Sequence, residues 1–194
     1  MLNFQHWLVV LSILISCAGG YAYVRDTFRG TTKPNRVSWG MWAVAPLIGT
    51  GAAIAAGADV WGTIRTFMAG FIPLVVFVAS FWNRQSYWET TAFDISCGAL
   101  SVVALIVWLL VGIPAYAVPI SALGDFLAAL PTIVKAWKFP ETETGITYVF
   151  SLISVFLVLP SIQMWNLQGS SFQIYLIVVN IMLITATYRK RIFR

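Results

Sequence analysis

The sequence contains very few charged residues: Asp, Glu, Lys and Arg together make up 10% of its 194 residues. Soluble globular domains carry about 25% of these residues, so the shortage excludes an ordinary soluble domain. Hydrophobic residues make up 59% of the chain, and its mean hydropathy is +0.83. The sequence therefore predicts an integral membrane protein in contact with the lipid bilayer.

Histidine and cysteine are also scarce. His6 is the single histidine and lies in the N-terminal tail, so no His-rich metal site is expected. The two cysteines, Cys17 and Cys97, fall within apolar stretches, which favours small buried side chains over a disulfide. No HExxH, GxSxG or P-loop pattern occurs. We therefore expect no enzyme, no metal and no cofactor.

What the sequence does contain is a series of apolar stretches long enough to cross a bilayer, which takes about 20 residues per helix. They predict an all-α protein with seven transmembrane helices, at roughly 7–26, 37–57, 63–82, 93–112, 115–136, 145–162 and 171–188. If these spans alternate in direction, Arg65 lies on one side and the other Lys and Arg residues lie on the opposite side. This distribution predicts an outside N-terminus and a cytoplasmic C-terminus in an inner or plasma membrane, and it gives no support to nucleic-acid binding.

The chain also resembles itself at an offset of 109 residues, where 24–39 aligns with 133–148 and the first three spans align with the last three. Both aligned loops lie on the same predicted side, so the two repeats are parallel and the fourth span restores the direction. We expect two parallel three-helix bundles, residues 1–88 and 114–194, joined by a linker helix within 89–113. Such repeats typically hold a substrate between them near the midplane.

Polar residues inside the spans are the candidate binding or coupling residues. Asp125 lies in the fifth span, where a carboxyl group is costly unless it faces protein or water. Ser121 and Thr132 share its helix face, and Ser16 is its counterpart at the offset of 109. Asn180 lies near the middle of the seventh span. For Asn180 and the serines, packing between helices is the open alternative.

Three residues are candidate hinges. Pro131 removes a backbone donor within the fifth span and predicts a bend near its cytoplasmic end. Gly19 and Gly20 in the first span are the other two candidates, because they lie near the counterpart of Pro131 at the offset of 109.

Residues near the ends of spans leave alternatives open. Arg65 is predicted either to extend to the interface or to contact a substrate. Glu141 and Glu143 predict either a solvated loop or a gate in which they pair with basic residues. Trp39 and Tyr148 are expected in an aromatic belt at the membrane interface.

The segment from Pro131 to Gly145 resembles the PQ-loop superfamily, in particular the SWEET and SemiSWEET sugar carriers. Its Pro131-Thr132 pair looks like the family's Pro-Gln pair, although Thr132 stands where the family has Gln. Its remaining matches look like the family's basic loop and its Ser/Thr-Glu-Gly turn: Lys135, Trp137-Lys138 and Glu141-Thr142-Glu143-Thr144-Gly145.

This resemblance implies a membrane transporter for a sugar or another small polar solute that works by alternating access. Proton coupling through Asp125 is a further expectation, because burial would raise the tendency of a carboxyl group to be protonated in one state. The alternative is a non-transporting membrane receptor or assembly protein with the same fold, which binds partners through its basic loops and tail. One chain carries both repeats and could work alone, and the sequence leaves the formation of homo-oligomers open.

Overall fold

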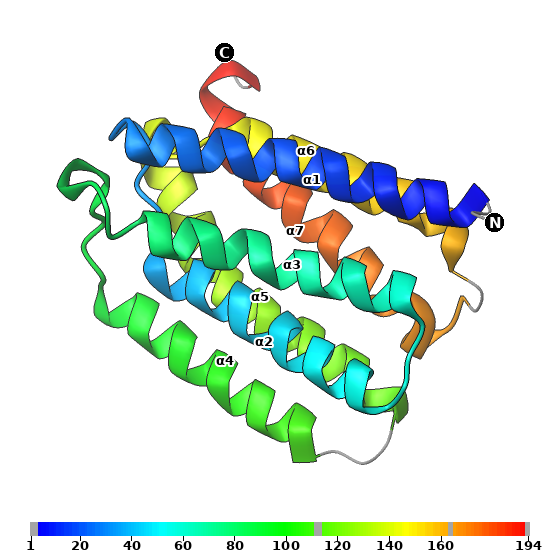
Figure 1. The fold of residues 1–194 in the computed structure, drawn as a ribbon. Coiled ribbons are helices and arrows are strands. Elements are labelled where there is room, and N and C mark those ends of the chain that lie inside the picture. Colours follow the sequence, from blue (N-terminus) through cyan, green and yellow to red (C-terminus); the bar gives the residue numbers. More distant parts are fainter. Residues whose placement is uncertain (1–3, 111–113, 163–164, 193–194) are drawn as a thin grey trace.

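The computed structural model describes residues 4–110, 114–162 and 165–192, and all regular structure within them is helical. These residues form seven α-helices (Figure 1): α1 (Phe4–Phe28), α2 (Arg36–Ala55), α3 (Val60–Ala79), α4 (Ala92–Leu110), α5 (Pro114–Lys138), α6 (Gly145–Val158) and α7 (Leu167–Ile192). Three short 3-10 helices follow α3, α5 and α6: η1 (Arg84–Ser86), η2 (Pro140–Thr142) and η3 (Leu159–Ser161). Arg194 and residues 111–112 of the predicted fourth span lie outside the described residues.

Six of the helices are long and apolar enough to cross a membrane, which supports the prediction of an all-α membrane protein. Helix α6 is shorter, although with η3 it forms a continuous apolar segment, Gly145–Ser161. Pro160 explains why α6 does not continue, because proline has no backbone N–H to donate to the preceding turn and the chain passes into the short 3-10 helix η3 there. The predicted sixth span, 145–162, is therefore a shorter helix than its neighbours.

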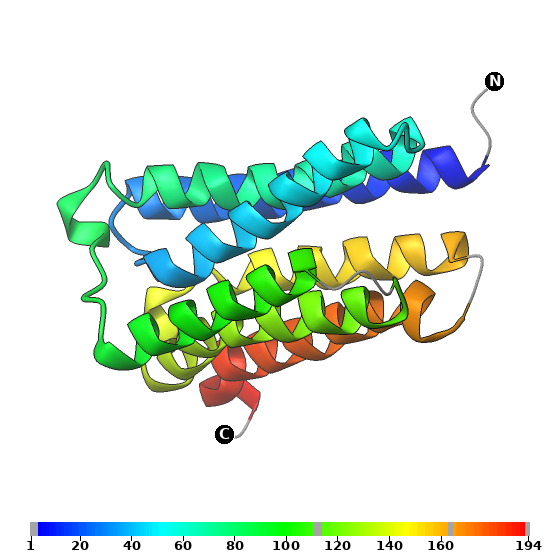
Figure 2. The same ribbon diagram turned by 90° about the horizontal axis from the view of Figure 1, so that it is seen from below.

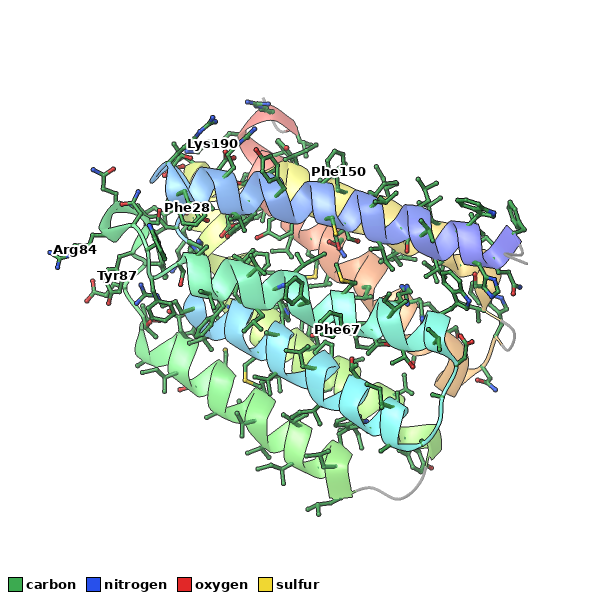
Figure 3. All side chains as sticks on the ribbon, in the orientation of Figure 1. Phe28, Phe67, Arg84, Tyr87, Phe150 and Lys190 are labelled. Carbon is green, nitrogen blue, oxygen red and sulfur yellow. The ribbon has the colours of Figure 1, made fainter. Side chains whose placement is uncertain are left out.

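Consecutive helices alternate in direction (Figure 1), so one end of the molecule collects the ends of α1, α3, α5 and α7. We call this the basic end, because the last turns of three of these helices carry Lys or Arg, which the helix dipole favours there: Arg25 in α1, Lys135 and Lys138 in α5, and Arg189, Lys190 and Arg191 in α7. Figure 3 shows Arg84 and Lys190 extending outward toward this end. Arg65 lies in α3, nearer the opposite end.

Side-chain caps fix where the helices start at the basic end. The Oδ1 atom of Asn35 accepts hydrogen bonds from the N–H groups of Val37 and Ser38, at 3.1 and 3.2 Å. Thr91 and Asp94 form a reciprocal capping box at the start of α4, with N–H to side-chain oxygen distances of 2.8 and 3.2 Å. Such caps typically stabilise a helix by about 1 kcal/mol. They hold the first turns of α2 and α4 in place at the basic end.

The helices pack in a regular order. Helix α3 contacts both α1 and α2, α7 contacts both α5 and α6, and α4 lies against α5. Two further pairs, α1 with α6 and α2 with α5, join these groups. Figure 2 shows α1, α2 and α3 on one side of the molecule and α4 to α7 on the other. The buried core between them contains Tyr23, Trp39, Val76, Ala129, Tyr148, Val179 and Leu183.

The close contact of α3 with α2 gives a stability prediction at Gly70. A Cβ atom added there would lie 2.9 Å from the carbonyl oxygen of Ala43 and 2.9 Å from Cγ of Leu47. Since backbone atoms cannot move aside easily, Gly70→Ala should lower the free energy of unfolding by about 1–3 kcal/mol. The measurement is the thermal unfolding midpoint of the purified protein in detergent.

Gly51 of α2 provides the matched control. A Cβ atom added at Gly51 would meet no atom within 4 Å, so Gly51→Ala should be neutral or stabilise the helix by up to about 1 kcal/mol. Equal unfolding midpoints for the two variants would contradict the close approach of α2 and α3 at Gly70.

Candidate functional site

A cavity of about 540 Å³ lies between the helices, and all seven α-helices contribute to its lining. We call it the central cavity. Its walls are mostly apolar, with Trp42 and Trp108 among the aromatic residues, and hydroxyl, amide and charged side chains are interspersed among them. Pockets for small molecules commonly have volumes of about 300–1,000 Å³ and this mixed lining. The cavity is therefore large enough for a small metabolite.

The central cavity collects four of the five predicted binding residues: Ser16, Ser121, Asp125 and Asn180. Thr132 is the exception, because it is fully buried outside the lining. The Thr132 hydroxyl has no hydrogen-bond partner within the part of the chain that the structure describes. Ser121 and Asp125 thus both border the cavity, whereas Thr132, about two turns further along α5, does not; a binding role for these residues stays a prediction.

Asp125 is held by a residue that the sequence pattern did not indicate. The hydroxyl group of Tyr175, from α7, donates a hydrogen bond to Oδ2 of Asp125. The rings of Phe126 and Phe172 pack around Tyr175, with centroid distances of 6.4 and 5.7 Å. Asp125 also borders a second cavity of about 20 Å³, which is large enough for one water molecule. A carboxyl group in this position can accept hydrogen bonds from a solute or exchange a proton.

Both serines line the cavity and also form hydrogen bonds within the protein, and a binding role for them stays a prediction. The hydroxyl of Ser16 lines the cavity and donates to Oγ of Ser154 at 2.8 Å, which joins α1 to α6. Ser121 lines the cavity while its hydroxyl donates to the carbonyl oxygen of Val118 at 2.8 Å. Asn180 likewise donates to its own helix, in a 2.7 Å bond to the carbonyl of Leu176.

The hinge candidates lie in tightly packed positions. A Cβ atom added to Gly19 would lie 3.0 Å from Cβ of Phe150 in α6, and one added to Gly20 would lie 2.5 Å from Cγ2 of Ile72 in α3. Pro131 is fully buried, and α5 runs as one helix through it. Close helix approach therefore explains the two glycines, whereas a hinge role for the three residues stays a prediction.

Toward the basic end, five buried side chains separate the central cavity from the surface. We call them the basic-end network: Tyr23, Trp39, Lys135, Glu143 and Tyr148. Their exposed fractions are 0%, 4%, 2%, 8% and 3%. Trp39 and Tyr148 also line the cavity, so they form its floor at this end. The cavity extends from this floor toward Arg65, near the start of α3.

An ion pair lies at the centre of the basic-end network. Nζ of Lys135 is 2.6 Å from Oε1 of Glu143, and both side chains are almost inaccessible. The other carboxylate oxygen, Oε2, accepts hydrogen bonds from the hydroxyl groups of Tyr23 and Tyr148, at 2.8 and 2.6 Å. Lys135 also donates to the carbonyl oxygen of Lys33 in the α1–α2 loop. Both buried charges are thus paired and hydrogen-bonded.

The two glutamates of the loop before α6 have different environments. Glu141 is exposed and its carboxylate lies 3.4 Å from Nζ of Lys190. The pKa of Glu141 is below its ordinary value, mainly because its own backbone N–H donates to the carboxylate and secondarily because Lys190 is near. Glu143 is buried in the basic-end network. Both glutamates pair with a lysine, Glu141 in an exposed position and Glu143 in a buried one, and a gate formed by these residues stays a prediction.

The prediction that Trp39 and Tyr148 belong to an interfacial aromatic belt is wrong. Both are buried in the core, and the Tyr23 ring lies between them, with centroid distances of 4.5 Å to Trp39 and 6.4 Å to Tyr148. Nε1 of Trp39 donates to the Tyr23 hydroxyl at 3.3 Å. Polar atoms on these rings can satisfy buried partners, which an interfacial position would not require.

Comparisons of the chain with protein-family models, with curated proteins and with solved structures found no match. The candidate site is therefore defined by its own geometry, which combines a central cavity, a carboxyl group at its wall and a charge-paired floor.

The buried ion pair gives a second stability prediction. Glu143→Gln leaves Lys135 buried without its counter-charge, which typically costs about 3–5 kcal/mol. Glu141→Gln, the matched control, removes an exposed pair worth about 0–1 kcal/mol. Thermal unfolding midpoints of the two purified variants make the comparison.

A double variant separates charge from packing. Lys135→Met combined with Glu143→Gln leaves no buried charge and should recover part of the stability lost in Glu143→Gln. If Glu143→Gln is as mild as Glu141→Gln, the buried pair does not hold the basic end together.

Proposed function

We propose that the protein carries a small polar solute across the membrane by alternating access to the central cavity. The observation that carries this proposal is that a solute-sized cavity ends, at the basic end, against a buried network of residues from both halves of the chain. A cavity accessible from one side at a time is what alternating access requires. The charge distribution supports a cytoplasmic basic end and an outside N-terminus.

We further propose that the chain forms two parallel three-helix bundles, residues 1–88 and 114–194, with a linker helix within 89–113. The packing order supports this arrangement, because every contact between α-helices of one half has a counterpart in the other. The pair α1–α3 corresponds to α5–α7, and α2–α3 corresponds to α6–α7. The contacts between halves, α1–α6 and α2–α5, also exchange with each other under a two-fold rotation.

Residues separated by 109 positions also meet at the basic end. The backbone N–H of Lys33 donates to the carbonyl oxygen of Thr142 at 3.0 Å. Trp39 and Tyr148 belong to the same buried cluster and both form the floor of the cavity. Equivalent positions approach each other only near a rotation axis, so the Lys33–Thr142 hydrogen bond and the shared cluster favour an axis that passes near the basic-end network.

The resemblance to the PQ-loop superfamily and the SWEET-like carriers gains support from the position of its segment. Lys135 and Glu143, which form the buried ion pair, both lie within Pro131–Gly145. Pro131 lies one helical turn before Lys135. We propose that bending near Pro131 moves Lys135 and opens the floor of the cavity, with Gly19 and Gly20 as flexible points in α1.

Opening the basic end requires the separation of contacts that cross between the halves. At the basic end these include the hydrogen bonds from Tyr23 to Glu143, from Lys135 to the Lys33 carbonyl and from the Lys33 N–H to Thr142. Thr144 adds two more, with Thr32 and with Asp26. The Lys135–Glu143 pair lies within the second half and can stay intact. The proposed movement therefore exposes this pair to water without separating the two charges.

Transport can be measured in proteoliposomes with a panel of sugars and amino acids, with and without an imposed pH gradient. We expect saturable uptake by the wild-type protein, and we expect Asp125→Asn to abolish uptake or make it independent of the gradient. The reason is that Asp125 is the carboxyl group in the described lining of the cavity, whereas an amide cannot exchange a proton in this way. Glu89→Gln, which alters an exposed carboxylate in the loop before α4, is the matched control.

Two outcomes would count against these assignments. Wild-type uptake that remains dependent on pH in Asp125→Asn would remove Asp125 from the coupling step. No uptake of any panel member by folded protein would favour the alternative, a receptor or assembly protein, and deletion of residues 189–194 should then abolish partner binding.

A further inference from the structure

Arg65 is the one Lys or Arg residue among the described residues that line the central cavity. It lies in the second turn of α3 and is half-buried. Within residues 4–110, 114–162 and 165–192, its guanidinium group forms no ion pair and no side-chain hydrogen bond. The other buried or half-buried cations among the described residues lie at the basic end, away from the cavity lining; Arg36, Lys135 and Arg189 have side-chain partners there, and Lys33 has none. Arg65 is therefore a cation at the cavity wall that forms no ion pair with a described residue.

An unpaired charge beside an apolar wall is unfavourable, because burial removes part of its hydration. A negatively charged ligand would bind more favourably than a neutral one, because it would pair with the guanidinium group. The guanidinium group is planar and offers two parallel N–H donors, a geometry that matches a carboxylate. A neutral sugar would leave this charge unpaired.

The Asp125 carboxylate disfavours doubly charged anions in the cavity more than singly charged ones. It lines the same cavity, and a doubly charged phosphate would be repelled by an ionised carboxylate there. A singly charged carboxylate is balanced by Arg65 alone. Since Asp125 also accepts hydrogen bonds, a ligand with a hydroxyl or amino group at its other end suits the wall that Asp125 forms.

We infer that Arg65 binds the carboxylate of a small organic acid with a hydroxyl or amino group, and that this is the class of solute held in the central cavity. The amide of Gln173 also lines the cavity and provides a further donor from α7. The inference rests on the proposed carrier function for its transport step. Binding, in contrast, can be measured in the absence of transport.

The test uses two pairs of probes that differ at the carboxylate: D-glucuronate with D-glucose, and L-alanine with L-alaninamide. Thermal shift titrations of the purified full-length protein in detergent measure binding of each probe. We expect one or both carboxylate probes to raise the unfolding midpoint saturably, while their partners do not. Arg65→Gln should weaken carboxylate binding at least tenfold, and Arg65→Lys should weaken it less, because lysine keeps the charge but loses the two-pronged geometry.

Arg84→Gln is the matched control, since Arg84 extends from the loop after α3 at the basic end, away from the cavity (Figure 3). It should leave carboxylate binding unchanged. The inference is overturned if neither carboxylate binds, or if Arg65→Gln binds them as the wild type does, in which case Arg65 only extends to the membrane interface. If Arg65→Gln fails to fold, Arg65→Lys decides, because wild-type affinity in that variant excludes paired hydrogen bonding to the carboxylate.

Binding and transport fail independently in this design. Carboxylate binding that depends on Arg65, without uptake in proteoliposomes, would support the binding site and contradict the carrier function. Uptake of glucose that is unchanged in Arg65→Gln, without carboxylate binding, would support a carrier and overturn the role of Arg65.

Discussion

The buried ion pair between Lys135 and Glu143 is the interaction on which the basic end of the structure depends. Burial of two opposite charges is energetically tolerable only when they form an ion pair and when their remaining donors and acceptors form hydrogen bonds. The second carboxylate oxygen of Glu143 has two tyrosine hydroxyl groups as donors, and Lys135 has the carbonyl of Lys33. The hydroxyl groups of Tyr23 and Tyr148 are therefore positioned by the ion pair, and the Tyr148 ring forms part of the floor of the cavity.

The helices could be predicted from the sequence because their signals are local. Apolar runs of about 20 residues and the distribution of Lys and Arg depend on the bilayer alone, and they predicted the all-α fold with helix limits within a few residues. Asp125 was predictable for a similar reason, since a carboxyl group at that depth must face something polar. Its position on the cavity follows from the same constraint.

Other parts of the site could not be predicted, because they depend on which helices become neighbours. Tyr175 is 50 residues from Asp125, and no periodicity links them. Glu141 and Glu143 are two residues apart in a polar loop, yet one is exposed and the other is buried. Trp39 and Tyr148 lie where interfacial aromatics are common, and their burial reflects the approach of α2 and α6 to Tyr23. The packing of the helices, rather than the composition of each segment, determines the burial and the partners of these side chains.

The location of the ion pair within one half of the chain has an energetic consequence for alternating access. Among the described residues, five hydrogen bonds of the loops and the basic-end network cross between the halves: those from Tyr23, Lys135 and Lys33, and those that Thr144 forms with Thr32 and Asp26. At a net of about 0.5–1.5 kcal/mol for each neutral bond and about 1.5–3 kcal/mol for each bond to a charged group, their loss costs several kcal/mol, which differential binding of a solute would have to offset. Separation of Lys135 from Glu143 would add about 3–5 kcal/mol. In the proposed movement both charges travel together, so the basic end would open without the cost of separating the ion pair.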